Sequence, residues 1–177
     1  MSTRMTQKEL HDIFLEDIGT FAGRVEDCGR KPLKMHLDFP FNRDIKAFIW
    51  NCTAPPGGRS IDEYKVQLIL ENQKRGMRGH FDETDGYKSL IIGYATPFVD
   101  KLQGLWVLFE LDKHREFAYS ANIQIYLRQL IEAFKHEIYV YQKHNHETVV
   151  VCTRPFLFEG MKKRFDIDFE IMMEKYK

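Results

Sequence analysis

The sequence predicts an α+β fold, in which a twisted, mostly antiparallel β-sheet or a barrel-like core is flanked by N- and C-terminal helices. Helical periodicity is confined to residues 6–22, residues 127–134 and the stretch after Pro155. Several short apolar runs rich in β-forming residues lie between these segments. The runs do not alternate regularly with helices, which disfavours a doubly wound parallel sheet.

Length and composition fit one packed domain that spans residues 1–177. Apolar residues make up 44% of the 177 positions and aromatic residues 14%, which is enough for a hydrophobic core. The 26 basic and 26 acidic side chains give a net charge of zero. Proteins that coat nucleic acid nonspecifically are usually basic, so any DNA contact here must come from a local patch.

The cysteine and hydropathy patterns limit the cofactor and the location. Cys28, Cys52 and Cys152 lie far apart and form no CxxC pair, so neither a disulfide framework nor a structural zinc site is predicted. We expect no cofactor. Free thiols are typical of the reducing cytosol, and no run approaches the roughly 18 apolar residues of a membrane span. We therefore expect a cytoplasmic protein that has no membrane partner.

The first half of the chain contains one helix and several strands. Thr6 can cap the helix, with Glu9 at the capping-box position. A single apolar stripe follows at three- and four-residue spacing: Leu10, Ile13, Phe14, Ile18 and Phe21. The helix should fade near Gly23, with DCGRKP as a connection. KMHLDF and DIKAFIWN are predicted strands, and TAPPGGRS is a loop because Pro-Pro-Gly-Gly cannot hold regular structure.

The middle of the chain is predicted to be strand-rich. In EYKVQLIL, alternate apolar residues face one way while Lys65 and Gln67 face the other, as in a half-buried strand. YKSLIIGY and LWVLFEL are apolar strands, and FAYS and NIQIYL are short ones. Trp50 and Trp106 lie in apolar strands and are expected in the core.

The last third should contain a short helix, a hairpin and a final helix. LRQLIEAF is the short helix, and EIYVYQK and ETVVVCT flank a polar HNH turn. The pair His144 and His146 can bind a metal, but a polar turn is far more common. His80 and His114 are isolated and treated as surface residues. Pro155 starts the final helix, whose broken apolar stripe is Phe158, Met161, Phe165, Phe169 and Met172.

The loop NQKRGMRGHFDETDG is the first candidate site. It gathers Lys74, Arg75 and Arg78 within five residues, beside Gly76 and Gly79. Glycine lets the backbone adopt positive φ and approach a partner closely, and arginine offers a rigid donor fork to phosphates and guanine edges. The alternative is a solvated hairpin connection. The neighbouring acids Glu71, Asp82, Glu83 and Asp85 would have to point away from a polyanion.

The segment FAYSANIQI is the second candidate site. Asn122 and Gln124 can pair bidentately with adenine, Tyr119 can stack on a displaced base, and Ser120 adds a hydroxyl. The alternative is a simple turn, because Ser-Ala-Asn is ordinary turn composition.

A third pattern resembles the active site of metal-dependent nucleases of the PD-(D/E)xK type. Glu63-Tyr64-Lys65 begins a predicted strand, and Asp44 precedes Glu63 by 19 residues. Two carboxylates of this kind bind Mg²⁺, and the lysine supports the attacking water. The proline that often precedes the upstream aspartate is absent, since Arg43 stands there. The alternative is a charged strand edge.

Residues from about Phe48 to Ile125 resemble a domain of bacterial restriction–modification genes, often found beside a methylase or a nuclease. The resemblance rests on IWNCT, EYKVQLIL, QKRGMRG and FAYSANIQI, in that order. It implies a recognition domain that directs a restriction system to a sequence or a methylation state. It also implies a small twisted β-barrel with flanking helices.

These observations together predict a double-stranded DNA recognition module of a restriction or phage-defence system, without catalysis of its own. It would sense methylated DNA or a specific sequence and work with a nuclease, motor or methylase subunit or domain. Lys74, Arg75 and Arg78 would contact phosphates, and Tyr119, Ser120, Asn122 and Gln124 the bases. One alternative is a small Mg²⁺-dependent nuclease using Asp44, Glu63 and Lys65. The other is a non-catalytic protein-interaction subunit.

Overall fold

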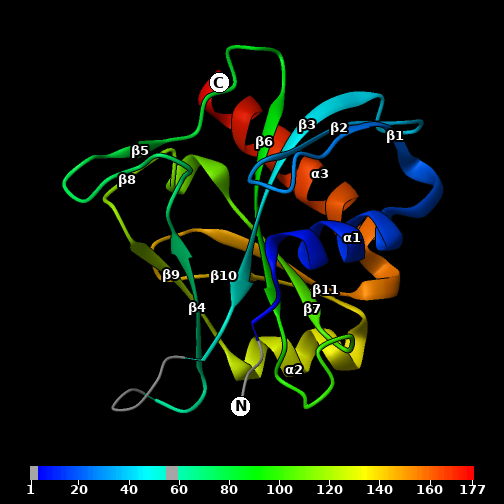
Figure 1. The fold of residues 1–177 in the computed structure, drawn as a ribbon, viewed down its shortest axis with the longest axis vertical. Helices are drawn as coiled ribbons and strands as arrows, with labels where there is room; N and C mark the ends of the chain where they lie inside the picture. Colours follow the sequence, from blue (N-terminus) through cyan, green and yellow to red (C-terminus); the bar gives the residue numbers. More distant parts are fainter. Residues whose placement is uncertain (1–3, 55–59) are drawn as a thin grey trace.

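A seven-stranded sheet forms the middle of the molecule in the computed structural model, which describes residues 4–54 and 60–177 (Figure 1). Residues 55–59 of the predicted TAPPGGRS loop lie outside the described residues. Along the sheet the strands are β1 (Ala22–Glu26), β2 (Leu33–Leu37), β3 (Arg43–Cys52), β6 (Lys88–Ala95), β7 (Leu105–Phe109), β11 (Thr148–Thr153) and β10 (Ile138–Gln142).

The sheet is open and mostly antiparallel. Within it only β3 and β6 run parallel, with Ile45 opposite Lys88 and Cys52 opposite Ala95. β1 and β10 form opposite edges of the sheet. The predicted α+β class and its mostly antiparallel sheet are therefore confirmed, whereas the barrel-like alternative is wrong.

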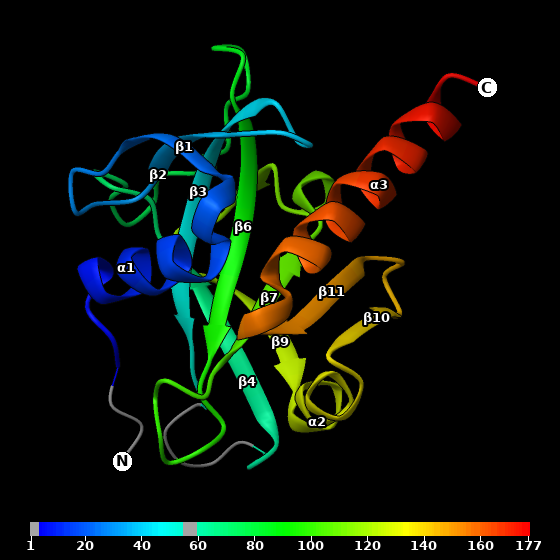
Figure 2. The same ribbon diagram turned by 90° about the vertical axis from the view of Figure 1, so that its right-hand side faces the viewer.

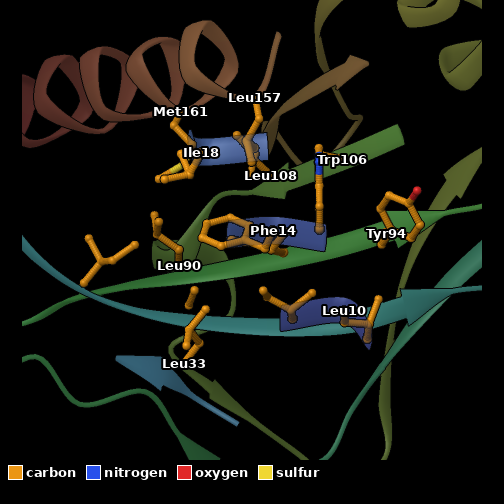
Figure 3. Packing of buried hydrophobic residues seen from close by; sticks show 14 of the residues in the cluster. Leu10, Phe14, Ile18, Leu33, Leu90, Tyr94, Trp106, Leu108, Leu157 and Met161 are labelled. Carbon is orange, nitrogen blue, oxygen red and sulfur yellow. The ribbon is translucent and has the colours of Figure 1, made fainter. Parts of the chain in front are cut away.

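One face of the sheet is covered by α1 (Gln7–Ile18) and α3 (Leu157–Lys175) (Figure 2). Phe14 and Ile18 of α1 and Leu157 and Met161 of α3 pack against the sheet over this face (Figure 3). The ring of Trp106 meets Phe14 edge-on at 5.5 Å and donates through Nε1 to Asp17 at 2.8 Å. Trp106 is fully buried and belongs to the core, as predicted.

The other face of the sheet is covered by α2 (Leu127–His136) and by a separate two-stranded ribbon. The ribbon consists of β4 (Glu63–Leu68) and β9 (Ala121–Tyr126), paired antiparallel with Val66 opposite Ile123. Its buried side chains are Val66, Leu68, Ile123 and Ile125, which pack with Trp50, Val107 and Phe109 in a second core cluster. Trp50 is 7% exposed and also belongs to the core.

A second short pairing continues the ribbon at one end. β5 (Gly79–His80) pairs with β8 (Glu116–Phe117). The loop 69–78 joins β4 to β5, and the turn 118–120 joins β8 to β9. The two connections therefore lie at the same end of the ribbon.

Local signals account for most helix boundaries. Thr6 accepts from the Glu9 amide at 3.2 Å while Glu9 accepts from the Thr6 amide at 2.7 Å, which is the predicted capping box. α1 ends earlier than predicted, because Gly19 takes a φ of +57° and the chain then enters β1, a strand that the sequence did not predict. No helix among the described residues is long and apolar enough to span a membrane.

The apolar stripe predicted for the last helix is buried only over its first half. Met161 and Phe165 are buried, but Phe169 is 58% exposed and Met172 is 45% exposed. Figure 2 shows α3 running out beyond the strands toward the C-terminus, so the sheet ends before the helix does.

This difference gives a matched test of the packing of α3. Phe165→Ala should cost about 3–5 kcal/mol of unfolding free energy, because a buried phenylalanine leaves a cavity. Phe169→Ala, one turn later, should stay within about 0.5 kcal/mol of the wild type. Urea denaturation measures both. Equal losses would show that α3 packs along its whole length and that its placement here is wrong.

Candidate functional site

The ribbon presents a row of polar side chains on the side opposite its apolar one. Because side chains alternate along a strand, burying Val66 and Ile123 turns Lys65, Gln67, Asn122 and Gln124 outward, where the three amides are exposed and Lys65 is half-buried. Cross-strand pairing places Lys65 opposite Gln124 and Gln67 opposite Asn122. We call this outward set the ribbon face.

Hydrogen bonds order part of the ribbon face. Gln124 donates from Nε2 to Glu63 Oε1 at 3.0 Å, and Gln67 donates from Nε2 to the Ser120 hydroxyl. Among the described residues, the Asn122 side chain makes no hydrogen bond with the protein. An exposed amide held on a strand can therefore present both its donor and its acceptor to a partner.

The structure brings the two predicted DNA-contacting segments together. Arg75, Arg78 and Met77 of the basic loop line a shallow hollow with Tyr119 and Ser120 of the turn. Lys74 lies in the same loop, where its carbonyl accepts from the Met77 amide at 2.9 Å. Lys74, Arg75 and Arg78 are all exposed. Residues about 40 positions apart in the sequence thus form one cationic and aromatic end of the ribbon.

Glycine is required at two positions of the basic loop for different structural reasons. Gly76 takes a φ of +87°, which favours glycine in a tight turn. Gly79 has ordinary φ, but a Cβ there would lie 2.3 Å from the Phe117 ring, so its small size permits the β5–β8 pairing. The predicted positive φ therefore holds at Gly76 and is wrong for Gly79.

Most acidic neighbours of the loop are engaged by other groups. Asp85 accepts from the Lys46 ammonium at 2.9 Å, and Glu83 accepts from Arg115 at 3.0 Å. Hydrogen bonds from Thr84 lower the pKa of Asp82, and the hydrogen bond from Lys46 lowers that of Asp85. Arg78 does face a carboxylate, because its Nε lies 3.7 Å from Glu116.

A second hollow, of about 460 Å³, lies on the β9 side of the ribbon face, which contributes Asn122 and Gln124 to its lining. The turn between β10 and β11 closes it, so we call it the hairpin hollow. Arg128 and Lys143 also line it. The guanidinium of Arg128 lies 5.4 Å over the Tyr126 ring. The exposed Arg128 adds positive charge beyond the basic loop, whereas Lys143 is ion-paired with Glu147.

A buried carboxylate organises the hairpin hollow. Glu147 lies 2.8 Å from His114 Nε2, and its Oε2 lies 2.9 Å from the Lys143 ammonium in an ion pair without hydrogen-bond geometry. Burial opposes ionisation of Glu147, yet the hydrogen bond from His114 and the charge of Lys143 outweigh it, so the pKa of Glu147 is lowered. The expectation that His114 is a surface residue is wrong, since its side chain is 17% exposed.

A third hollow, of about 720 Å³, lies on the β4 side of the ribbon at the edge of the sheet. Lys65 and Gln67 form part of its lining, together with Trp50, Arg30 and Lys31. We call it the edge hollow. The ribbon face thus runs between two recesses, one beside each of its strands.

The structure separates the residues of the nuclease alternative. Thr53, the first residue after β3, pairs with Lys65, whereas Asp44 lies near the start of β3, 2.9 Å from His36 in a hydrogen bond. At about 3.3 Å per residue, Asp44 lies on the order of 30 Å from Thr53. Asp44 therefore does not share a metal site with Glu63 and Lys65. Within the described residues no group of three or more metal-ligating side chains occurs.

Comparison with known proteins gives a family. A family model described as Methylase-associated X1 (MTaX1) matches residues 43–160, which is well over half of the chain. The chain belongs to the MTaX1 family. The match begins with β3 and ends in α3, so it includes the whole ribbon face and the hairpin hollow. Of the edge hollow it includes the side formed by β3, β4 and the loop after β4, but not Arg4, Gln7 or residues 29–31. No curated protein and no solved structure matches the chain.

The family confirms the predicted association with methylases, which points to a restriction–modification context. The MTaX1 region also contains residues that the sequence patterns did not single out, chiefly Arg128, Lys143 and Gln67. Arg128 and Lys143 come from separate elements that meet only in the fold. Gln67 carried a signal, because it faces away from the apolar side of EYKVQLIL.

The buried Glu147 gives a pH prediction for this site. A carboxylate whose folded pKa is lowered adds stability above its unfolded pKa of about 4.3, and this stability is lost as the pH falls. Glu147→Gln should cost about 3–5 kcal/mol at pH 7, because it leaves the Lys143 ammonium without its buried carboxylate partner. As the pH falls from about 5 toward the lowered folded pKa, the variant should lose less stability than the wild type.

Urea denaturation of both proteins at several pH values measures this difference. Other carboxylates titrate equally in the two proteins, so the difference in pH slope isolates Glu147. Parallel pH profiles would contradict the ion-pair arrangement.

Proposed function

We propose that the chain is a double-stranded DNA recognition module of a methylase-linked restriction or phage-defence system, without catalysis of its own. The observation that carries the proposal is the ribbon face, with its amides and the flanking cations of the basic loop. The chain would form one domain and direct a methylase, nuclease or motor subunit to its target.

The shape of the ribbon supports contact with a DNA groove. The major groove is about 12 Å wide and admits a two-stranded β-ribbon, whose strands lie about 4.8 Å apart. β4 and β9 form such a ribbon, and their outward side chains include Gln67, Asn122 and Gln124. Asparagine and glutamine amides match the donor and acceptor pattern of adenine.

The charge distribution supports phosphate contacts on both sides of the groove. Lys74, Arg75 and Arg78 lie at one end of the ribbon, while Arg128 lies beside β9. With no net charge on the chain, bulk attraction to DNA is weak, so these local cations would have to supply the electrostatic part of the affinity. Specific contacts would then supply much of the remainder.

The protein-interaction alternative has its own supporting observation. The end of α3 exposes Phe169, Met172, Met173 and Tyr176. Apolar side chains gathered on one surface often mark a protein contact. Absence of binding to any duplex at low salt would favour this alternative over DNA recognition.

The first test of DNA recognition measures affinity. Replacing Lys74 and Arg75 by alanine should weaken binding to all duplexes alike and lower the salt slope by about one unit per lost phosphate contact. Fluorescence anisotropy on methylated and unmethylated duplexes at two salt concentrations measures both quantities. The matched control replaces two exposed lysines of α3, Lys162 and Lys163, by alanine. This control should bind like the wild type. An unchanged salt slope in the Lys74 and Arg75 double variant would show that the basic loop does not contact phosphates.

The second test measures specificity. Asn122→Ala and Gln124→Ala should each reduce discrimination between a preferred and a mutated site by about 1–3 kcal/mol, as expected for a lost bidentate base contact. Their salt slopes should stay near that of the wild type, because phosphate contacts are retained. Sites selected from a random duplex pool supply the preferred sequence. Tyr119→Ala, checked by a thermal melt, tests stacking on a displaced base in the same assay. Preference ratios equal to the wild type in all three variants would place recognition elsewhere.

A further inference from the structure

The edge hollow forms because β2 is shorter than its partner. β2 pairs with β3 only from Leu37 opposite Arg43 to Leu33 opposite Ala47. The remaining edge of β3, from Phe48 to Cys52, has no β2 residue beside it. The start of α1 lies there instead, since Gln7 donates to the Ile49 carbonyl at 3.2 Å and Asn51 donates to the Met5 carbonyl at 2.8 Å.

The lining of the edge hollow is strongly cationic. Arg4, Arg30, Lys31 and Lys65 line it, and its only acidic lining residue among those described is Glu71. Glu71 lies 2.8 Å from Arg30 in an ion pair. Arg4, Lys31 and Lys65 form no ion pair within the described part of the chain, although the charge of Glu71 acts on Lys31 from a distance.

Lys31 is the most confined of these cations. Its ammonium donates to Gln7 Oε1 at 2.9 Å and lies 5.4 Å from the centroid of the Trp50 ring. Both partners are neutral, and burial lowers the pKa of Lys31. A half-buried ammonium that contacts only an amide and an aromatic ring has no contacting carboxylate to offset its burial, so an external anion bound beside it would favour its charged form.

The remaining lining suits an anion that carries an organic group. Trp50, Ile69 and Leu70 give an apolar floor, and Gln67 and Thr53 add hydrogen-bonding groups. A volume of about 720 Å³ lies within the usual range for small-molecule sites. Like charges in a recess repel one another, so a bound anion would stabilise this arrangement.

We propose that the edge hollow binds a nucleoside phosphate, with Lys31, Arg4 and Lys65 contacting the phosphate and the apolar floor receiving the base. The nucleotide has two possible sources, a free nucleotide or a unit displaced from bound DNA. The second source rests on the proposed DNA recognition, because Lys65 and Gln67 belong to both the hollow and the ribbon face. The hollow is a different site from the one formed by Tyr119 and the basic loop.

The test uses the full chain and three variants. Lys31→Met removes the charge and keeps most of the stem, Lys31→Arg keeps the charge, and Lys162→Met removes an exposed lysine on α3 as the matched control. Isothermal titration with deoxyadenosine monophosphate, deoxycytidine monophosphate and inorganic phosphate measures the free ligands. Anisotropy with an intact duplex and with a duplex that contains one mismatched pair measures displaced nucleotides. Thermal melts establish that each variant is folded.

Lys31→Met should weaken binding of a nucleoside monophosphate at least tenfold, while Lys31→Arg and Lys162→Met change it less than threefold. If the nucleotide comes from DNA, Lys31→Met should also weaken binding of the mismatched duplex at least tenfold, and it should weaken binding of the intact duplex much less. If it is a free nucleotide, both duplexes should bind as before.

The proposal is overturned if folded Lys31→Met binds monophosphates and the mismatched duplex like the wild type. It is equally overturned if the wild type binds no monophosphate and shows no preference for the mismatch. In either case, retained binding of the intact duplex would leave the proposed DNA recognition standing, and loss of all duplex binding by the wild type would reject that proposal separately.

Discussion

Burial of the second face of the seven-stranded sheet determines what this molecule presents to a partner. That face carries Trp50, Val107 and Phe109, which need an apolar cover. The ribbon supplies it with Val66 and Ile123, among others, and each such side chain contributes about 1.5–3 kcal/mol when fully buried. Because strand side chains alternate, the same packing holds the ribbon face toward solvent. The candidate site is therefore a consequence of how the core is closed.

Charge is segregated although the net charge is zero. Lys46 and Arg115 engage Asp85 and Glu83, so these acids do not neutralise the basic loop. On the other side of the ribbon, Lys31 faces a neutral amide and an aromatic ring. The chain thus combines a balanced composition with separate groups of cations in the basic loop and the edge hollow. Such local groups attract polyanions without the strong nonspecific attraction of a basic protein.

The sequence predicted those features that depend on local pattern. Thr6 and Glu9 form the expected capping box, and the alternation in EYKVQLIL places Lys65 and Gln67 on the outward side. Features that depend on long-range pairing were not predictable. Nothing local indicates that β4 leaves the main sheet to pair with β9, or that His114 meets Glu147 across 33 positions.

Two predictions from the sequence, the buried stripe of the last helix and the nuclease spacing, disagree with the structure for the same physical reason. The helical stripe through Phe169 continues past the point where the sheet ends, and periodicity does not record how far the sheet extends. Likewise, the spacing between Asp44 and Glu63 fits a nuclease pattern, but β3 extends away from Asp44 as far as Cys52, and Lys65 pairs just beyond that end. Sequence separation says little about distance when the intervening chain is a strand. The amides of the ribbon face could be predicted from the sequence, whereas the recesses beside it could be found only from the fold.

Chemical-shift mapping tests the central claim most directly. A ¹⁵N-labelled chain is titrated with a short duplex, and the shifted amides are placed on the structure. DNA recognition through the ribbon predicts shifts in β4 and β9, the loop 69–78 and the turn 118–120, with α1 and α3 unaffected. Shifts confined to the exposed end of α3, or none at a duplex concentration that saturates other recognition modules, would contradict it.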